Sequence, residues 1–181
     1  MQKLLFSLFI LIIFSACNNK TKTLASADTA RVTDATYYFV RHADKVRAPN
    51  IGNNPPLNAN GKARAKFWAK QLKDVDFDAV YSTNFKRTRS TALPTAKQNK
   101  LEIKIYEPSE DFYVNFKDTH VGKNVLVVGH SNTIPAFVNA VLGEQKYNEI
   151  DDSTFGNLYI VRVKDGVAEA ELKDFNSWSK Q

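Results

Sequence analysis

Two short apolar runs determine the sheet of this protein, Tyr37-Tyr38-Phe39-Val40 and Val125-Leu126-Val127-Val128. Neither run contains a charged or chain-breaking residue, a pattern typical of a strand that is buried on both faces. A histidine follows each run, His42 after the first and His130 after the second. Because ligands bind outside the carboxyl ends of the strands in an open α/β sheet, we expect both histidines at a ligand site. The third histidine, His120, lies in a polar stretch and is expected at the surface.

The rest of the globular part alternates between strand and helix patterns. Residues 61–73 are predicted to form a helix, because Ala65, Trp68 and Leu72 share one side of the helical wheel. Further elements are expected as strands at 77–81 and 101–105, helices at 85–98 and 132–142, and a hairpin of 158–163 and 167–172. This alternation predicts one α/β domain: a mainly parallel sheet with helices on both faces and a C-terminal β-hairpin.

Composition and charge limit the classes of protein to which the chain can belong. Its 181 residues, 43% of them hydrophobic, can form one domain with a core, which excludes wholesale disorder. The excess of 25 Lys and Arg over 19 Asp and Glu suits an anionic ligand. The lysines of the 61–73 helix have no aromatic residues among them, so they indicate a solvated face, and no nucleic-acid partner is expected. One cysteine excludes an internal disulfide framework and a thiolate metal cluster.

The first 35 residues indicate export rather than folding. Lys3 precedes an apolar run, residues 4–14, which is too short to span a bilayer but fits the core of a secretory signal. The run ends in Phe14-Ser15-Ala16-Cys17, which resembles the lipobox of bacterial lipoproteins, although an aliphatic residue is more usual than Phe14. In such lipoproteins the peptide is cut before the cysteine, which is then lipid-modified.

We therefore expect residues 1–16 to be a signal peptide, 17–35 a lipidated Cys17 with a flexible polar tether, and 36–181 the folded domain. This organisation predicts a lipid-anchored membrane protein of the cell envelope that faces the periplasm. The alternative is an ordinary cleaved signal with an incidental cysteine.

Four blocks of sequence around the two histidines occur in a characteristic order. They are Arg41-His42-Ala43-Asp44, the segment 56–65, Ser82 with Arg87-Thr88-Arg89-Ser90-Thr91-Ala92, and Val128-Gly129-His130-Ser131. These blocks resemble, in the same order, the Arg-His-Gly-Glu signature, the Leu-Thr-x-x-Gly-x-x-Gln-Ala helix start, the Arg-x-x-x-Thr-Ala block and the Gly-His strand end of the histidine phosphatase superfamily. The resemblance to these phosphoglycerate-mutase-like proteins spans residues 37–132.

The resemblance implies a site for a phosphomonoester. His42 would be the nucleophile, whose neutral imidazole attacks phosphorus in line and forms a phosphohistidine. Arg41 and Arg87 would hold the phosphate, because guanidinium groups match its oxygens in charge and geometry. The family pattern selects Arg87 over Arg89, which is left as a surface charge.

Further contacts to the phosphate are implied by the same resemblance. His130, protonated beside the phosphate, would add a hydrogen-bond donor, and Lys45 and Ser131 are further candidate substrate contacts. The cationic groups supply the electrostatic stabilisation that a metal gives elsewhere, so neither a metal nor another cofactor is implied.

The proton donor for the leaving alcohol is less well determined by the motifs. Members of the family often place a carboxylate after the third strand, where Glu110 is the first choice and Asp111 and Glu107 are alternatives. Asp44, beside the nucleophile, is a further alternative, and some small relatives lack a clear acid. Phe112 and its aromatic neighbours in the same segment belong either to the wall of the pocket or to the core.

Two positions depart from the family pattern. Ala43 replaces the usual glycine after the nucleophile, which adds one methyl group. Ala48 stands where many relatives have a phosphate-contacting asparagine, and Lys45, Arg47 or Asn50 are the candidates to compensate.

Together these features predict a metal-independent phosphatase that hydrolyses a small phosphorylated substrate through a phosphohistidine. A phosphoglycerate-type mutase is an alternative, for which the chain is short and an exported protein would meet little glycolytic substrate. A non-catalytic phosphoryl-binding lipoprotein of the envelope is another.

The predicted lipid anchor can be tested by replacing the thiol of Cys17. Cys17→Ser should move the protein from the membrane fraction to the soluble fraction, because serine offers no thiol for the lipid. Fractionation of cells measures the change, with Ser26→Ala in the tether as a control that stays with the membranes. Unchanged fractionation of Cys17→Ser would contradict the anchor.

Overall fold

A computed structural model describes residues 34–178 of the chain. The predicted signal peptide, Cys17 and nearly all of the predicted tether lie outside these residues. The strands are β1 (Ala35–Arg41), β2 (Ala79–Ser82), β3 (Ile103–Ile105), β4 (Asn124–Gly129), β5 (Asn157–Lys164) and β6 (Val167–Asp174). The helices are α1 (Ala59–Gln71), α2 (Lys86–Gln98), α3 (Glu110–Val114), α4 (Phe116–Thr119) and α5 (Thr133–Leu142). None of the described helices is both long and apolar enough to cross a membrane.

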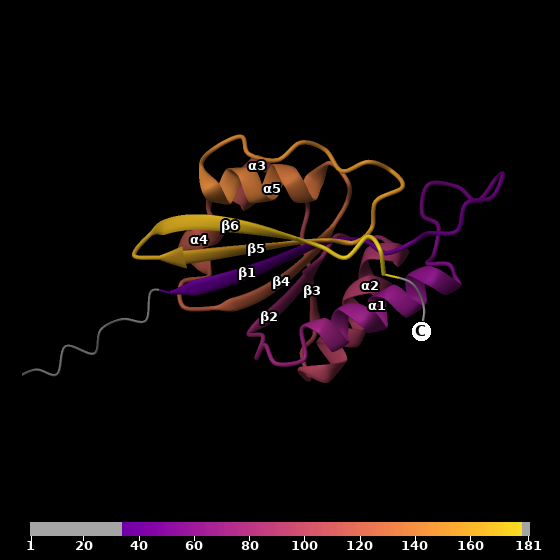
Figure 1. The fold of residues 1–181 in the computed structure, drawn as a ribbon, viewed down its shortest axis with the longest axis horizontal. Coiled ribbons are helices and arrows are strands. Elements are labelled where there is room, and N and C mark those ends of the chain that lie inside the picture. The colour runs from indigo at the N-terminus through magenta and orange to yellow at the C-terminus, as the bar shows by residue number, and fades with distance from the viewer. Residues whose placement is uncertain (1–33, 179–181) are drawn as a thin grey trace, which may run out of the picture. The chain divides into compact units, whose positions relative to one another are not determined.

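The six strands form one mixed sheet in the order β3-β2-β4-β1-β5-β6 (Figure 1). Strands β3, β2, β4 and β1 run parallel, whereas β5 is antiparallel to β1 and β6 is antiparallel to β5. Asp165 and Gly166 connect β5 to β6 with φ values of 50° and 80°, the conformation that a two-residue hairpin turn requires. The predicted parallel sheet with a C-terminal hairpin is confirmed.

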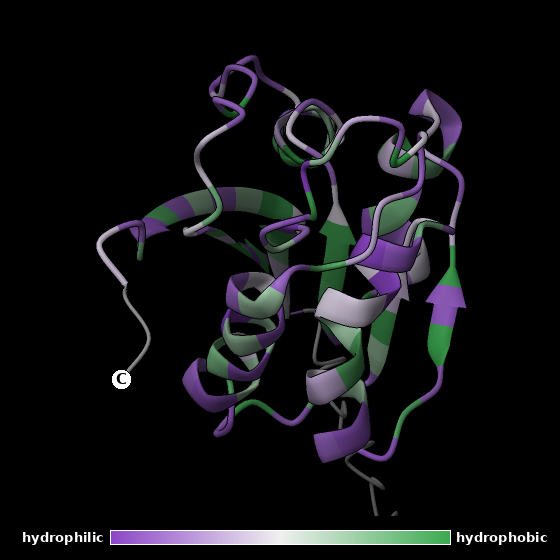
Figure 2. Ribbon diagram, turned by 90° about the vertical axis from the view of Figure 1, so that its right-hand side faces the viewer, coloured by the Kyte–Doolittle hydropathy of each residue, from purple (hydrophilic) through white to green (hydrophobic). Residues whose placement is uncertain are grey.

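Helices cover both faces of the sheet. Figure 1 shows α3 and α5 on one side and α1 and α2 on the other. Trp68 of α1 and Leu72, which follows this helix, pack with Leu126 of β4 in one buried cluster, and Phe137 of α5 packs with Phe39 of β1 in the other. Figure 2 shows hydrophobic residues along the central strands and mixed polarity along the helices. This distribution follows from the periodicity of the sequence, which leaves one polar side on each long surface helix.

The pairing of β1 with β4 brings the ends of the two apolar runs together. Its parallel register pairs Arg41 with Gly129. The backbone N–H of His42 then donates to the carbonyl oxygen of Gly129 at 2.8 Å. Because the two strands end at the same edge of the sheet, the next residue of each, His42 and His130, begins a loop at that edge.

The start of α1 is fixed to the loop that follows His42. The Asn58 side chain caps the helix by accepting from the N–H of Gly61 at 2.8 Å. Gly61 lies so close to the backbone of Asp44 that a methyl group there would overlap the carbonyl oxygen of Asp44. Arg64 donates to the Asp44 carboxylate at 2.7 Å, and this ion pair is largely buried.

The expected surface position of His120 is wrong. The side chain is only 9% exposed and stacks on Phe116 with ring centroids 4.1 Å apart. Its Nε2 lies 3.0 Å from the hydroxyl of Tyr81, and its Nδ1 lies 3.0 Å from the carbonyl oxygen of Phe116. The sequence did not predict α3 and α4, and these short helices turn the polar stretch back onto the sheet. Tyr113 and Phe116 thereby become core residues.

Gly61→Ala should destabilise the protein by about 1–3 kcal/mol, because the new methyl group forces α1 away from the loop after His42. At a helical position with room for the methyl group, replacing glycine by alanine instead stabilises the protein slightly. Urea unfolding measures the difference, with exposed Lys62→Ala as a control expected within about 0.5 kcal/mol of the wild type. A neutral or stabilising Gly61→Ala would refute the close approach.

Candidate active site

Three segments that are distant in sequence meet at the carboxyl edge of the sheet. Arg41 ends β1 and His42 follows it, Arg87 lies in the first turn of α2, and His130 follows β4. The rings of His42 and His130 lie 5.5 Å apart between centroids. Arg87 Nη2 lies 3.4 Å from His130 Nδ1. The structure therefore brings together the four residues that the sequence singled out.

The hydrogen bond of His42 fixes the tautomer of its ring. Nδ1 lies 2.8 Å from the carbonyl oxygen of Ala43, which only accepts, so Nδ1 carries the proton. Burial, together with the charges of Arg41 and Arg87, lowers the pKa of His42 to about 3. The ring is therefore neutral at neutral pH, and its Nε2 holds an unshared electron pair.

The tautomer of His130 follows from a threonine that the sequence analysis did not select. Thr83 donates its hydroxyl hydrogen to Thr88 Oγ1 at 3.0 Å, since Thr88 uses its own hydrogen on the carbonyl oxygen of Thr83. The Thr83 oxygen thus accepts from His130 Nε2 at 2.9 Å. This leaves His130 Nδ1 without a proton and turned toward Arg87. The position of Thr83 directly after β2, at the same sheet edge, was the available signal.

His130 is neutral in this structure. Burial, together with the charges of Arg87 and Arg41, lowers its pKa to about 4. The expected protonated form therefore requires a bound anion, whose charge would raise the pKa of His130.

Arg41 is held from one side by backbone. Its Nη1 donates to the carbonyl oxygens of Asp151 and Thr154 at 2.7 and 2.8 Å, and its guanidinium stacks on Phe155 at 4.4 Å from the ring centroid. Among the described residues, the Nε atoms of Arg41 and Arg87 are both buried without a hydrogen-bond partner. Unpaired buried donors are costly, and two on neighbouring guanidinium groups suit an anion between them.

One carboxylate contacts this cluster, and it was not among the expected residues. Asp152 forms ion pairs with Arg47 at 2.6 Å, Arg41 at 2.8 Å and Lys45 at 3.8 Å. The hydrogen bond from Arg47 and the one from Arg41 hold the pKa of Asp152 well below its usual range. No motif of the sequence marks this pairing, because it depends on how the loop 151–154 folds back onto Arg41.

The predicted acid Glu110 is not brought to the cluster. Glu110 is exposed at the start of α3 and lines a cavity of about 510 Å³ with Tyr113, Asn139 and Gly143. No hydrogen bond or ion pair between described residues links it to the four site residues. The alternatives Glu107 and Asp111 are exposed as well.

Other expected contacts are placed as follows. Asp44 is paired with Arg64, and Ser131 Oγ lies 3.5 Å from Glu149 Oε1. Arg89 is exposed and donates to Asn84, as expected for a surface charge. Ala43 is fully buried, and its N–H donates to Thr91 Oγ1 at 2.9 Å.

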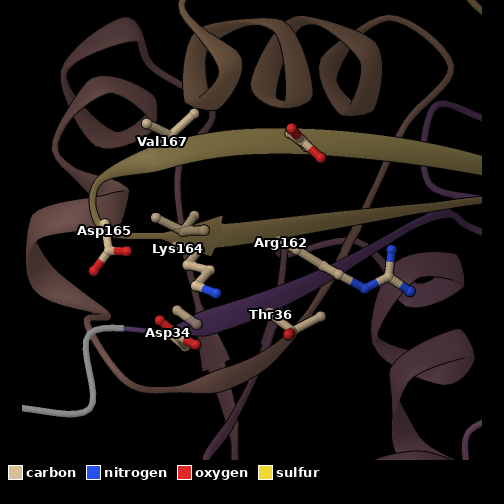
Figure 3. A pocket seen from close by; sticks show the side chains of 9 residues that line it. Asp34, Thr36, Arg162, Lys164, Asp165 and Val167 are labelled. Carbon is tan, nitrogen blue, oxygen red and sulfur yellow. The ribbon is translucent and has the colours of Figure 1, made fainter.

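A cavity of about 390 Å³ opens beside Arg87. The loop after His42 supplies most of its lining, including Lys45, Arg47, Ala48, Ile51 and Asn53. Another cavity, of about 490 Å³, lies at the opposite end of β1 (Figure 3), where Asp34, Thr36 and Arg162 line it. The second cavity contains none of the four site residues. Within residues 34–178, no group of three or more His, Cys, Asp or Glu side chains is arranged to hold a metal ion.

Comparison with known proteins gives matches to phosphatases. Residues 37–111 match the sequence model of the Histidine phosphatase superfamily (branch 1). Phosphoserine phosphatase 1 from Hydrogenobacter thermophilus is 37% identical over 70 residues, which is 36% of this chain and 33% of that protein. The chain therefore matches about a third of the length of this curated relative.

Solved structures with the same fold include two phosphatases. The protein histidine phosphatase SixA, complexed with tungstate, has a TM-score of 0.64 at 16% identity, covering 77% of this chain and 96% of that one. The alpha-ribazole phosphatase from Shigella flexneri has a TM-score of 0.58 at 14% identity, covering 81% and 99%. These likenesses establish the phosphoglycerate-mutase-like fold.

The lowered pKa of His42 predicts that acid destabilises the protein. Between about pH 6.5 and pH 3 the unfolded chain binds a proton at His42 that the folded protein does not, so stability falls as the pH falls. Lowering the pH from 7 to 5 should therefore reduce the free energy of unfolding by up to about 2 kcal/mol through this residue. Urea unfolding at pH 7 and at pH 5 measures this loss of unfolding free energy, which should be smaller for His42→Gln than for the wild type. Equal differences would contradict the buried neutral ring.

Proposed function

We propose that the chain, whose residues 37–111 match the Histidine phosphatase superfamily (branch 1), hydrolyses a phosphomonoester through a phosphohistidine on His42, without a metal. The observation that carries the proposal is the tautomer of His42. Its Nδ1–H donates to Ala43, so the electron pair of Nε2 is available beside two guanidinium groups whose Nε–H donors have no partner within residues 34–178. A buried neutral imidazole in cationic surroundings suits attack on an anionic phosphoryl group.

In the first step, Arg41 and Arg87 hold the phosphoryl oxygens while His42 Nε2 forms a bond to phosphorus and the bond to the alcohol oxygen breaks. Positive charge develops on the imidazole as the bond forms. The carbonyl oxygen of Ala43 stabilises this charge through the hydrogen bond from Nδ1. The guanidinium groups stabilise the charge that builds up on the oxygens of phosphorus.

His130 changes its protonation state with the ligand. The dianion raises the pKa of His130, so that Nδ1 gains a proton while Thr83 continues to accept from Nε2. With Glu110 away from the cluster and Asp152 ionised, His130 is the group that gives a proton to the leaving alcohol. Neutral His130 then takes a proton from the water that attacks the phosphohistidine, which releases phosphate and restores both rings.

The names of the relatives do not agree on a substrate. One is a phosphoserine phosphatase, one a protein histidine phosphatase and one an alpha-ribazole phosphatase. The SixA structure, which has the same fold, is complexed with tungstate, a tetrahedral oxyanion, and this supports an oxyanion ligand for the chain. We also propose that a lipid on Cys17 displays the domain in the cell envelope, which the lipobox-like sequence supports.

His42→Ala should reduce phosphate release from 4-nitrophenyl phosphate by roughly a thousandfold or more, because it removes the attacking nitrogen. A chelator should leave the wild type unaffected, and Arg89→Gln on the exposed side of α2 should retain activity. Full activity of His42→Ala would refute the nucleophile. Stabilisation of the wild type by phosphate without any turnover would favour the phosphoryl-binding alternative.

A further inference from the structure

Three cations converge on the carboxylate of Asp152. Arg47 Nη1 lies 2.6 Å from Oδ2, whereas Arg41 Nη2 lies 2.8 Å and Lys45 Nζ 3.8 Å from Oδ1. Arg41 comes from the end of β1 and the other two from the loop after His42, whereas Asp152 lies between α5 and β5. The arrangement is thus a carboxylate site that the chain itself fills.

The charges around this site do not balance. Arg41, Lys45 and Arg47 contact one carboxylate, and Arg87 lines the same cavity as Lys45 and Arg47. Four positive charges therefore face two negative ones, because the carboxylate of Asp151 also interacts with Arg41, whereas His42 and His130 are neutral. When the side chain of Asp152 moves into solvent, a phosphoryl dianion between Arg41 and Arg87 leaves positive charge in excess, and this excess lies on the side of Lys45 and Arg47.

The side chain of Asp152 can leave without disturbing Arg41. Its side chain is 61% exposed, so its removal exposes no core. Arg41 is held independently, because its Nη1 donates to the backbone oxygens of Asp151 and Thr154. The ion pair of Asp152 with Arg47 is exposed on both sides, and such a pair contributes little to stability, so a ligand carboxylate can compete with Asp152 for Arg47.

We propose that Lys45 and Arg47 bind a carboxylate of the substrate in the place that Asp152 occupies, so that the substrate is a small phosphomonoester with a carboxylate near its phosphate. The inference rests on the proposed phosphatase function and adds the class of substrate. Arg41 contacts both places, which puts the two anionic groups only a few covalent bonds apart. The alternative, an amine of the substrate bound by Asp152, is disfavoured because three cations already surround that carboxylate.

Two phosphonates that differ only in the carboxylate test the inference without turnover. Calorimetry on the intact protein should show 3-phosphonopropionate binding about tenfold more tightly than propylphosphonate. Arg47→Gln should reduce this ratio to within about threefold of unity, because it removes the closest partner of the carboxylate. Asp152→Asn should strengthen binding of 3-phosphonopropionate, because it removes the competing charge.

Arg89→Gln is the matched control, since it removes an exposed arginine outside the cavity and should leave the ratio unchanged. Raising the salt concentration should lower the ratio in the wild type, because the added contact is between charges. Equal affinities in the wild type, or a ratio that Arg47→Gln does not change, would overturn the carboxylate site. Neither result depends on hydrolysis of 4-nitrophenyl phosphate, whose absence would overturn the proposed function instead.

Discussion

The hydrogen bond from the N–H of His42 to the carbonyl oxygen of Gly129 is the constraint on which the site depends. It is the last rung of the parallel ladder between β1 and β4, and it sets both histidines at one edge of the sheet. A side chain at Gly129 would meet the hydroxyl of Tyr106 at 2.8 Å and the side chains of Thr133 and Ile134 at 2.9 Å, so these side chains would have to shift. A shift of one residue in this register would turn every side chain of β1 to the other face and separate the two rings.

The site is electrostatically costly in the absence of a ligand. Two guanidinium groups, from Arg41 and Arg87, lie beside two neutral imidazoles, and the Nε donors of both are buried without partners among the described residues. The surrounding structure holds them in place through stacking on Phe155 and Phe85. An anion would satisfy the donors and balance the charge. Ligand binding would therefore offset the free-energy cost of burying this cluster and stabilise the folded protein.

The sequence predicted those parts that depend on local pattern. The run 125–128, the 61–73 helix and the C-terminal hairpin were found because their periodicity and turn residues are local properties. The four site residues were found because two follow buried strands and all four fit an ordered set of motifs. Asp152 and Thr83 could not be assigned from pattern alone, because their roles depend on loop conformation and on a hydroxyl network. Glu110 begins α3, a helix that was not expected, and lines a cavity together with residues of α5.

The most direct test of the central claim is to locate the phosphoryl group during turnover. The protein would be mixed with a phosphomonoester, quenched rapidly in alkali and digested, and the peptides analysed by mass spectrometry. The neutral tautomer of His42 predicts a phosphoryl group on the peptide that carries this residue and none on the peptide that carries His130. A phosphoryl group on His130, or release of phosphate with neither histidine modified, would contradict the account.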